Sequence, residues 1–290
     1  MKDLSNIKTV KEIISKNGFK FSKSLGQNFI IDPEVCPKMA QSCTESEGII
    51  EIGPGIGTLT LELAKRFKKV VAIEIDKRLI PIIKSNFEEF TNISILNQDI
   101  LKTDIDEIIN KEFKGFKSVG ICANLPYYIT SEVIMHLLES RFKINSITVM
   151  VQKEAAERIC ALPGTRKSGA ISVAVRYFGN PKILFNVNKT CFIPTPNVDS
   201  SVMKIDIKNS NSAQIKDKDI FFKVVKAAYF QRRKNLLNSL SAGLSISKKE
   251  ISLILEKSFV NPSLRAENLK FENFISISNV ICENYIRKNN

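Results

Sequence analysis

The segment from Ile49 to Thr60 constrains the fold more than any other part of the chain. It begins with a short apolar run, passes through Gly53, Gly55 and Gly57, and continues into helix-forming residues. That order is typical of a buried strand, a tight turn and a helix, with backbone N–H groups open to a ligand at the turn. The G-x-G-x-G spacing differs from the G-x-G-x-x-G of a dinucleotide site. Because glycines also serve purely structural turns, a ligand site needs further support.

That support comes from the next apolar run, residues 69–76, which carries Glu74 near its end. A carboxylate about twenty residues beyond a glycine turn can accept hydrogen bonds from both hydroxyl groups of a ribose. An acid at a strand end can also be merely solvated. The register of Glu74 with the glycines favours a nucleoside-binding site.

Strand-like and helix-like segments alternate from residue 48 onward. We expect strands near residues 49–52, 69–75, 93–97, 118–123 and 146–151, and helices near 58–66, 77–89, 104–112, 131–141 and 153–160. This alternation predicts an α/β fold with a mostly parallel sheet covered on both faces. Ligands of such sheets bind at the carboxyl ends of the strands. We expect Glu51 with the glycines, Glu74, Asp99 and Asn124 to converge there on one crevice.

Residues 26–31 form a predicted irregular loop, because Asp32 and Pro33 are typical of a helix start. Such a loop can lie across a ligand or only cover the edge of the sheet.

The chain is predicted to have two domains. Residues 1–207 comprise an N-terminal arm and the α/β domain, and residues 208–290 form a smaller all-helical domain. The polar stretch at residues 209–214 is the predicted linker.

The chain is strongly basic, with a formal net charge of +13, which favours a polyanionic partner. The densest basic cluster is Arg232, Arg233 and Lys234, which follows Tyr229 and Phe230. Basic residues beside aromatic ones on helices suit an RNA backbone. A solvated helix face is the alternative.

Composition also excludes several classes of site. The six cysteines are scattered without a C-x-x-C pair, which favours reduced thiols in a cytoplasmic protein. The single histidine, His136, lies in an apolar helical segment and is not expected to be a catalytic base; no metal site is predicted. The chain shows neither a membrane-spanning run nor a signal-peptide core, so we expect no membrane partner.

Asn124, Leu125, Pro126 and Tyr127 follow the fourth predicted strand and suit chemistry on an aromatic amine. The Asn124 side-chain oxygen and a backbone carbonyl beside the proline can accept the two N–H bonds of such an amine, and Tyr127 can stack on its ring. This arrangement orients the nitrogen without a strong general base. The base must be unstacked or lie in a flexible RNA end. Asp99 can accept from an exocyclic amino group, such as that of an adenine, or only cap a helix or turn.

These motifs together resemble the ribosomal RNA adenine N6,N6-dimethyltransferases, and most closely their KsgA-type small-subunit members. The matching stretches are residues 24–32, 51–60, 73–76, 98–99, 124–127, 192–200, 230–240 and 265–269. They extend over nearly the whole chain.

The resemblance implies a Rossmann-like class I methyltransferase domain with S-adenosylmethionine as methyl donor. It implies that two adjacent adenosines near the 3′ end of 16S rRNA, within the small (30S) ribosomal subunit or its precursor, become N6,N6-dimethyladenosines, with a role in subunit biogenesis. We expect a monomer.

The implied donor contacts are Asn28, Ile30, Gly53, Gly55, Glu74, Ile75, Asp99, Ile100 and Asn124. The implied catalytic group is Asn124, Leu125, Pro126 and Tyr127, and the implied RNA contacts are Arg232, Arg233 and Lys234.

Three alternatives remain. The related methyltransferases of 23S rRNA, which confer macrolide resistance, share the glycine and N-L-P-Y motifs, but residues 192–200 and 230–240 resemble the small-subunit type better. A non-catalytic RNA-binding assembly factor would not need an intact donor site. DNA adenine methylases more often have proline where Leu125 stands.

Overall fold

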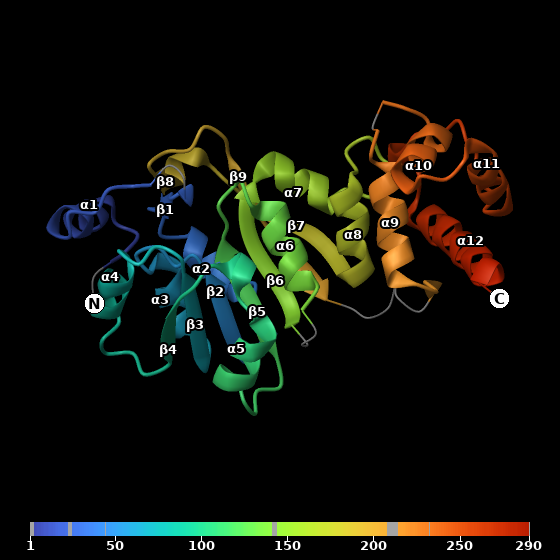
Figure 1. Cartoon of the computed structure of the whole chain (residues 1–290). Helices are drawn as coiled ribbons and strands as arrows, with labels where there is room; N and C mark the ends of the chain where they lie inside the picture. Colours follow the sequence, from blue (N-terminus) through green and yellow to red (C-terminus); the bar gives the residue numbers. More distant parts are fainter. Residues whose placement is uncertain are drawn as a thin grey trace. The chain divides into compact units, whose positions relative to one another are not determined.

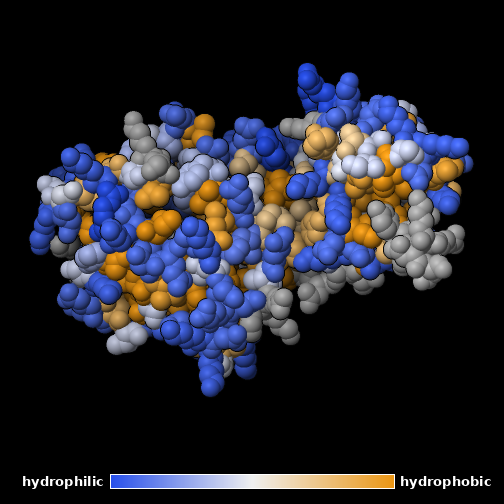
Figure 2. All heavy atoms as spheres, in the orientation of Figure 1, coloured by the Kyte–Doolittle hydropathy of each residue, from blue (hydrophilic) through white to orange (hydrophobic). Residues whose placement is uncertain are grey.

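The computed structural model describes residues 3–22, 25–43, 45–140, 144–207, 214–231 and 233–289. The chain forms two compact units. The first comprises Met1–Ala156 and Lys182–Ile207, and the second comprises Glu157–Pro181 and Lys208–Asn290. Hydrophilic residues cover much of the visible face, with hydrophobic residues showing between them (Figure 2).

The first unit is built on a seven-stranded sheet with strand order β4-β3-β2-β5-β6-β9-β7 (Figure 1). Its strands are β2 (Gly48–Ile52), β3 (Lys69–Glu74), β4 (Ile93–Asn97), β5 (Val119–Asn124), β6 (Ile144–Gln152), β7 (Gly179–Val187) and β9 (Ser200–Ile207). The pairs from β4 through β6 are parallel, and β9 is antiparallel to β6. The predicted mostly parallel sheet is therefore confirmed.

β2 is the strand at which the order of strand addition switches from one side of the sheet to the other. This switch point determines where a ligand can bind. From β2 the chain proceeds outward through β3 and β4, then returns to the other side of β2 as β5. Ile52 pairs with Ile73 on one side and with Ala123 on the other. A crevice at the carboxyl end is expected at such a switch point, so the residues after β2 and β5 face one another across it.

Helices of the first unit cover both faces of the sheet (Figure 1). They are α1 (Ile7–Lys16), α2 (Val35–Gln41), α3 (Thr58–Ala64), α4 (Ile80–Asn86), α5 (Ile105–Glu112), α6 (Thr130–Leu138) and the start of α7 (Lys153–Cys160). Met39 of α2 and Leu63 of α3 share a core with Ile49 of β2 and Cys122 of β5. Burial of these apolar faces fixes α2 and α3 on one side of the sheet.

The prediction of an irregular loop at residues 26–31 is wrong at two positions. Phe29 and Ile30 form the short strand β1 (Phe29–Ile30), which pairs with β8 (Phe192–Ile193) in a second, antiparallel sheet. The following helix also starts later than predicted: α2 begins at Val35, while Asp32 Oδ1 accepts a hydrogen bond from Glu34 N–H at 2.8 Å in the preceding turn. Local sequence rules cannot reveal a strand partner so distant in the chain.

The second unit is helical. It contains the end of α7, α8 (Ala170–Phe178), α9 (Lys218–Ala228), α10 (Leu236–Leu244), α11 (Lys248–Lys257) and α12 (Phe271–Asn289). Phe221, Leu240, Leu255 and Phe274 from four of these helices share one buried core with Val173 of α8. The all-helical tail predicted from the sequence is present among the described residues.

Residues 157–181 pack with this helical unit, whereas the sequence prediction placed them in the first domain. The cause is the apolar face of α8, which contributes Val173 to the helical core. The Ser168 hydroxyl also lies 3.2 Å from the Tyr229 hydroxyl. The predicted linker at 209–214 falls mostly outside the described residues.

Candidate active site

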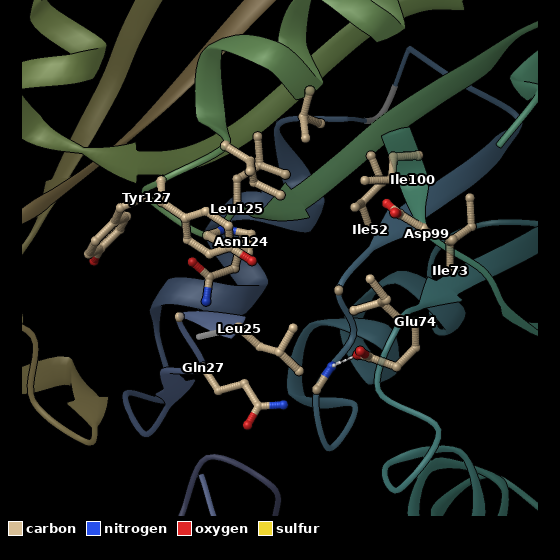
Figure 3. Close-up of a pocket in the computed structure, with 18 of the residues that line it drawn as sticks. Leu25, Gln27, Ile52, Ile73, Glu74, Asp99, Ile100, Asn124, Leu125 and Tyr127 are labelled. Carbon is tan, nitrogen blue, oxygen red and sulfur yellow. Dashed lines mark hydrogen bonds between the residues drawn. The ribbon is translucent and has the colours of Figure 1, made fainter. Parts of the chain in front are cut away.

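A pocket opens at the carboxyl edge of the sheet in the first unit (Figure 3). It is lined by eleven of the residues predicted to bind the donor or to act in catalysis: Asn28, Gly53, Gly55, Glu74, Ile75, Asp99, Ile100, Asn124, Leu125, Pro126 and Tyr127. Ile30 is not among the lining residues, because its side chain is buried in the core beside Phe192. Its predicted contact with the donor stays a prediction.

The glycine turn after β2 forms the floor of this pocket. Gly53, Gly55 and Gly57 all have positive φ angles, which residues with a β-carbon rarely adopt. Gly53 N–H is fixed by a 2.9 Å hydrogen bond to Ile73 O. A β-carbon on Gly55 would also lie 3.1 Å from the Phe29 ring. Glycine is therefore required here both for the turn and for the close approach of β1.

Glu74 ends β3 beside this turn and holds it. Its Oε2 accepts a 3.3 Å hydrogen bond from Gly55 N–H, drawn in Figure 3, and its Oε1 accepts from Asp76 N–H at 2.8 Å. Burial raises the pKa of Glu74 to about 7, although these backbone N–H groups oppose the shift. The carboxylate is thus poised to change charge near neutral pH and to gain from added hydrogen-bond donors.

Asp76 connects the N-terminal arm to this strand end. Its Oδ2 accepts from Gln27 Nε2 at 2.8 Å, and Arg78 binds both of its carboxylate oxygens. The Arg78 guanidinium is the main cause that lowers the pKa of Asp76 to about 2. Asp76 therefore stays ionised around neutral pH and keeps residues 25–28 against the pocket.

Asp99 lies on the same side of the pocket as Glu74, because it follows Asn97 of β4, which pairs with Glu74. Its Oδ1 accepts from Leu101 N–H at 3.1 Å and so caps the short 3₁₀ turn Ile100–Lys102. The alternative that Asp99 caps a turn is therefore confirmed for its Oδ1 atom. The residue also lines the pocket, so capping and ligand contact are compatible.

The Asn124–Tyr127 segment presents two hydrogen-bond acceptors to the pocket. Asn124 Nδ2 donates to Asn28 O at 3.1 Å, which orients the amide and leaves its Oδ1 free to accept. Leu125 N–H is held by Met150 O at 3.1 Å. Within the described residues no donor reaches Asn124 Oδ1 or Leu125 O. Two acceptors on adjacent residues match the two N–H bonds of one amino group.

Tyr127 and Pro126 complete this wall. The Tyr127 hydroxyl lies 2.8 Å from Ser200 Oγ, and burial raises the pKa of Tyr127. Pro126 O accepts from Ile129 N–H at 3.4 Å and is therefore occupied, unlike Leu125 O. The hydroxyl bond anchors the ring beside the acceptor pair (Figure 3).

The sequence prediction missed several lining residues. Leu25 and Gln27 come from the N-terminal arm, while Ile52 and Ile73 are register partners at the ends of β2 and β3. Ile52 and Ile73 were detectable, because each is the last or next-to-last residue of a strand that ends at the site. Gln27 gave no comparable signal, because its contact with Asp76 depends on how the arm folds back.

The prediction that Glu51 reaches the crevice is wrong, because Glu51 is buried within β2 and does not line the pocket. It is 1% exposed, and burial raises its pKa to about 8. Neither carboxyl oxygen has a hydrogen-bond partner among the described atoms. Glu51 is therefore mainly protonated at neutral pH, since an unpaired buried carboxylate would be costly.

His136 lies outside the site. Its Nε2 is 3.0 Å from Thr103 O, and the residue does not line the pocket. In the part of the chain that the structure describes, no group of three His, Cys, Asp or Glu residues can hold a metal ion. No described helix is long and apolar enough to cross a membrane.

The predicted RNA contacts belong to the second unit. Arg233 and Lys234 are exposed between α9 and α10, and Arg232 lies outside the described residues. Phe230, beside them, is an exposed aromatic residue. Their binding of RNA stays a prediction.

Comparisons with known proteins place these features in context. A family model described as ribosomal RNA adenine dimethylase matches residues 18–283. The ribosomal RNA small subunit methyltransferase A of Clostridioides difficile (strain 630) is 46% identical over 97% of this chain and 98% of that protein. The protein of the same name from Alkaliphilus oremlandii (strain OhILAs) is 44% identical over 96% of this chain and 98% of its own length.

Two solved structures have the same architecture. A dimethyladenosine transferase from Plasmodium falciparum matches with a TM-score of 0.73 and 25% identity, over 90% of this chain and 98% of that one. The 23S rRNA methyltransferase ErmE matches with a TM-score of 0.66 and 22% identity, over 88% and 99%, and indicates a shared fold only. The predicted Rossmann-like class I methyltransferase fold with a helical C-terminal region is confirmed.

Proposed function

Because this chain belongs to the ribosomal RNA adenine dimethylase family, we propose that it dimethylates N6 of two adjacent adenosines near the 3′ end of 16S rRNA. S-adenosylmethionine would be the methyl donor, and the small ribosomal subunit or its precursor the substrate. We further propose that the chain acts as a cytoplasmic monomer in small-subunit biogenesis. The shared name of the relatives at 44–46% identity favours the small subunit over 23S rRNA.

One observation carries this proposal: the acceptor pair of Asn124 and Leu125 opens into the same pocket as Glu74 and Asp99. When bound, S-adenosylmethionine supplies an electrophilic methyl group. The lining residues fit such a donor, since Glu74 can accept from ribose hydroxyls and Asp99 from an adenine amino group. The space beside Gly53 is not filled by protein atoms, since a β-carbon there would have only Asn124 O within 4 Å, at 3.9 Å. A ligand can therefore approach the turn at this position.

The target amine would be held by Asn124 Oδ1 and Leu125 O. Accepting both N–H bonds orients the nitrogen lone pair toward the methyl group, and most of the rate enhancement comes from this positioning. The ring of Tyr127, anchored through Ser200 Oγ, would stack on an adenine base taken out of its helix. The nitrogen loses its proton to solvent after transfer, so no lining residue has to act as a strong base.

We expect donor binding to weaken as pH falls through 7. Ribose hydroxyls that donate to Glu74 favour its ionised form, so binding lowers the pKa of Glu74 from about 7 and releases a proton. With a pKa of about 7 in the free chain, affinity for S-adenosylmethionine should be about tenfold lower at pH 6 than at pH 8. Isothermal titration calorimetry in two buffers of different ionisation enthalpy measures both the donor affinity and the number of protons released on binding.

The Glu74→Gln variant is the matched control for that pH dependence. It should bind the donor weakly at both pH values, without proton release from this site. The donor's own amino group titrates equally in both experiments, and Asp76 is already ionised in this range. Equal donor affinity of the wild type at pH 6 and pH 8 would contradict the proposal that Glu74 binds the ribose.

We expect RNA affinity to depend on salt through Arg233 and Lys234. Replacing both with glutamine removes two phosphate contacts, so the slope of log affinity against log salt concentration should become shallower by about 2. Filter binding to small subunits between about 50 and 300 mM KCl, a roughly sixfold range of ionic strength, measures the slope.

Lys111→Gln with Lys114→Gln is the charge-matched control. Both lysines are exposed around the end of α5 and the loop before β5, at the sheet edge opposite the pocket. This pair should leave the slope unchanged. If the salt slope is also unchanged in the Arg233 and Lys234 variant, these two residues belong to a solvated surface and do not contact RNA phosphates.

Substrate choice tests the function. The chain is incubated with labelled S-adenosylmethionine and with small subunits, large subunits or mixtures of both from cells that lack the modification. We expect label in small-subunit RNA only. Label in large-subunit RNA would assign the chain to the 23S class, and RNA binding without transfer would favour a non-catalytic assembly factor.

A further inference from the structure

Phe259 is both highly exposed and conformationally strained, and no contact among the described residues offsets either cost. It is the most exposed of the large apolar side chains described, at 96%. Its φ angle is +57°, in the left-handed region that bulky residues avoid. Among the described residues, its ring has no aromatic or cationic partner. A residue that is both strained and unpacked is a candidate for contact with another molecule.

The backbone around Phe259 explains why the left-handed conformation is imposed. Val260 N–H donates to Leu255 O at 2.9 Å, and Phe259 N–H donates to Glu256 O at 3.0 Å. These two bonds form a Schellman motif that ends α11, and its left-handed position usually holds glycine. Val260 and Leu255 are both buried in the helical core. The core thus fixes the turn, and the turn directs the Phe259 ring into solvent.

The two chain segments that are joined next to the Phe259 turn are basic. The following loop is tied to the start of α10, because Leu236 N–H donates to Leu264 O at 2.7 Å and Leu237 N–H donates to Pro262 O at 3.2 Å. The described cations on these joined segments are Arg233, Lys234, Lys257 and Arg265, all exposed. None of them forms an ion pair with a described residue. Glu256 is the one acid described in residues 229–235 and 256–265.

We propose that Phe259 stacks on an unpaired nucleobase of the rRNA substrate while the neighbouring cations bind its phosphates. An exposed aromatic ring beside unpaired cations matches the chemistry of a single-stranded RNA segment, in which bases have free faces and phosphates lie between them. An apolar protein partner would have to cover those cations without compensation. This inference rests on the proposed function and adds a base contact remote in sequence from the methylation site.

The Phe259→Gly variant separates this role from a structural one. Glycine removes both the ring and the left-handed strain, so the melting temperature of the full chain should rise by about 2 °C. Affinity for small subunits should nevertheless fall about tenfold, which is the effect of losing one base stack. The salt slope should not change, because phenylalanine carries no charge. Higher stability with weaker binding cannot result from damage to the fold.

Two further variants sharpen the test. Phe259→Tyr keeps a stacking ring and should bind like the wild type. Leu253→Ala removes another exposed apolar side chain of α11, outside the two joined segments, and should leave affinity unchanged.

Wild-type affinity in the Phe259→Gly variant overturns the inference while leaving methyl transfer intact. The inference is also overturned if that variant binds protein-free 16S RNA normally and loses affinity only for subunits, since the ring would then contact a ribosomal protein. Absence of RNA binding by the wild type would instead contradict the proposed function.

Discussion

We expect the Asn124→Ala variant to lose methyl transfer by roughly 10²–10³-fold while it still binds S-adenosylmethionine. The substitution removes Oδ1, one of the two acceptors that would orient the target amine, and positioned polar groups of this kind contribute about that factor. It also removes the 3.1 Å bond from Nδ2 to Asn28 O. The donor-side groups at Glu74, Gly55 and Asp99 remain, so donor affinity should change by no more than a few-fold. Single-turnover transfer and calorimetric donor binding measure the two effects.

Asn145→Ala is the matched control for Asn124→Ala. Asn145 lies near the start of β6, at the other edge of the sheet, where its Nδ2 donates to Glu45 O at 3.1 Å. It should transfer methyl groups at the wild-type rate. If Asn124→Ala loses donor binding as completely as Glu74→Ala does, Asn124 is a donor-binding residue and not the group that positions the target amine.

We expect the Gly57→Ala variant to be the most destabilised of the glycine substitutions. Its β-carbon would lie 2.2 Å from Phe87 Cε2, and the Phe87 ring is buried in the core of the first unit. Gly57 also has a φ angle of +98°. Backbone strain and overpacking together should lower the free energy of unfolding by roughly 2–5 kcal/mol. Urea denaturation followed by circular dichroism measures this difference.

Gly115→Ala isolates the packing contribution. Gly115 has a similar φ angle, +87°, but a β-carbon there would meet nothing within 4 Å. This variant should lose only about 1 kcal/mol of stability, from the backbone term alone. Equal destabilisation of both variants would mean that the Phe87 ring moves aside at no cost.

The parts of the site that obey local rules were predictable from the sequence. A glycine turn after an apolar strand predicts a strand end with exposed backbone N–H groups, and acids at strand ends converge wherever parallel strands share an edge. Gly53, Glu74, Asp99 and Asn124 were therefore brought to one pocket by reasoning from order and spacing. Even the ambiguity at Asp99 had a structural basis, because its Oδ1 caps a turn while the residue lines the pocket.

The parts that depend on contacts between distant segments were not predictable. Ile30 pairs with Phe192 across the two short strands, and this pairing, which no local pattern predicts, buries the Ile30 side chain. Gln27 is held at the pocket by a hydrogen bond to Asp76, which no local sequence pattern predicts. Residues 157–181 join the helical unit because α8 is amphipathic, and amphipathicity alone does not say which core a helix will join.

The most direct test of the central claim is to identify the methylated nucleoside and its position. Small subunits that lack the modification are incubated with labelled S-adenosylmethionine and the chain, and the RNA is digested and sequenced by mass spectrometry. We predict that label appears as N6,N6-dimethyladenosine at two adjacent positions near the 3′ end of 16S rRNA, and that it is lost with Asn124→Ala. Label at any other atom or site, or undiminished transfer by Asn124→Ala, would contradict the proposed reaction at this pocket.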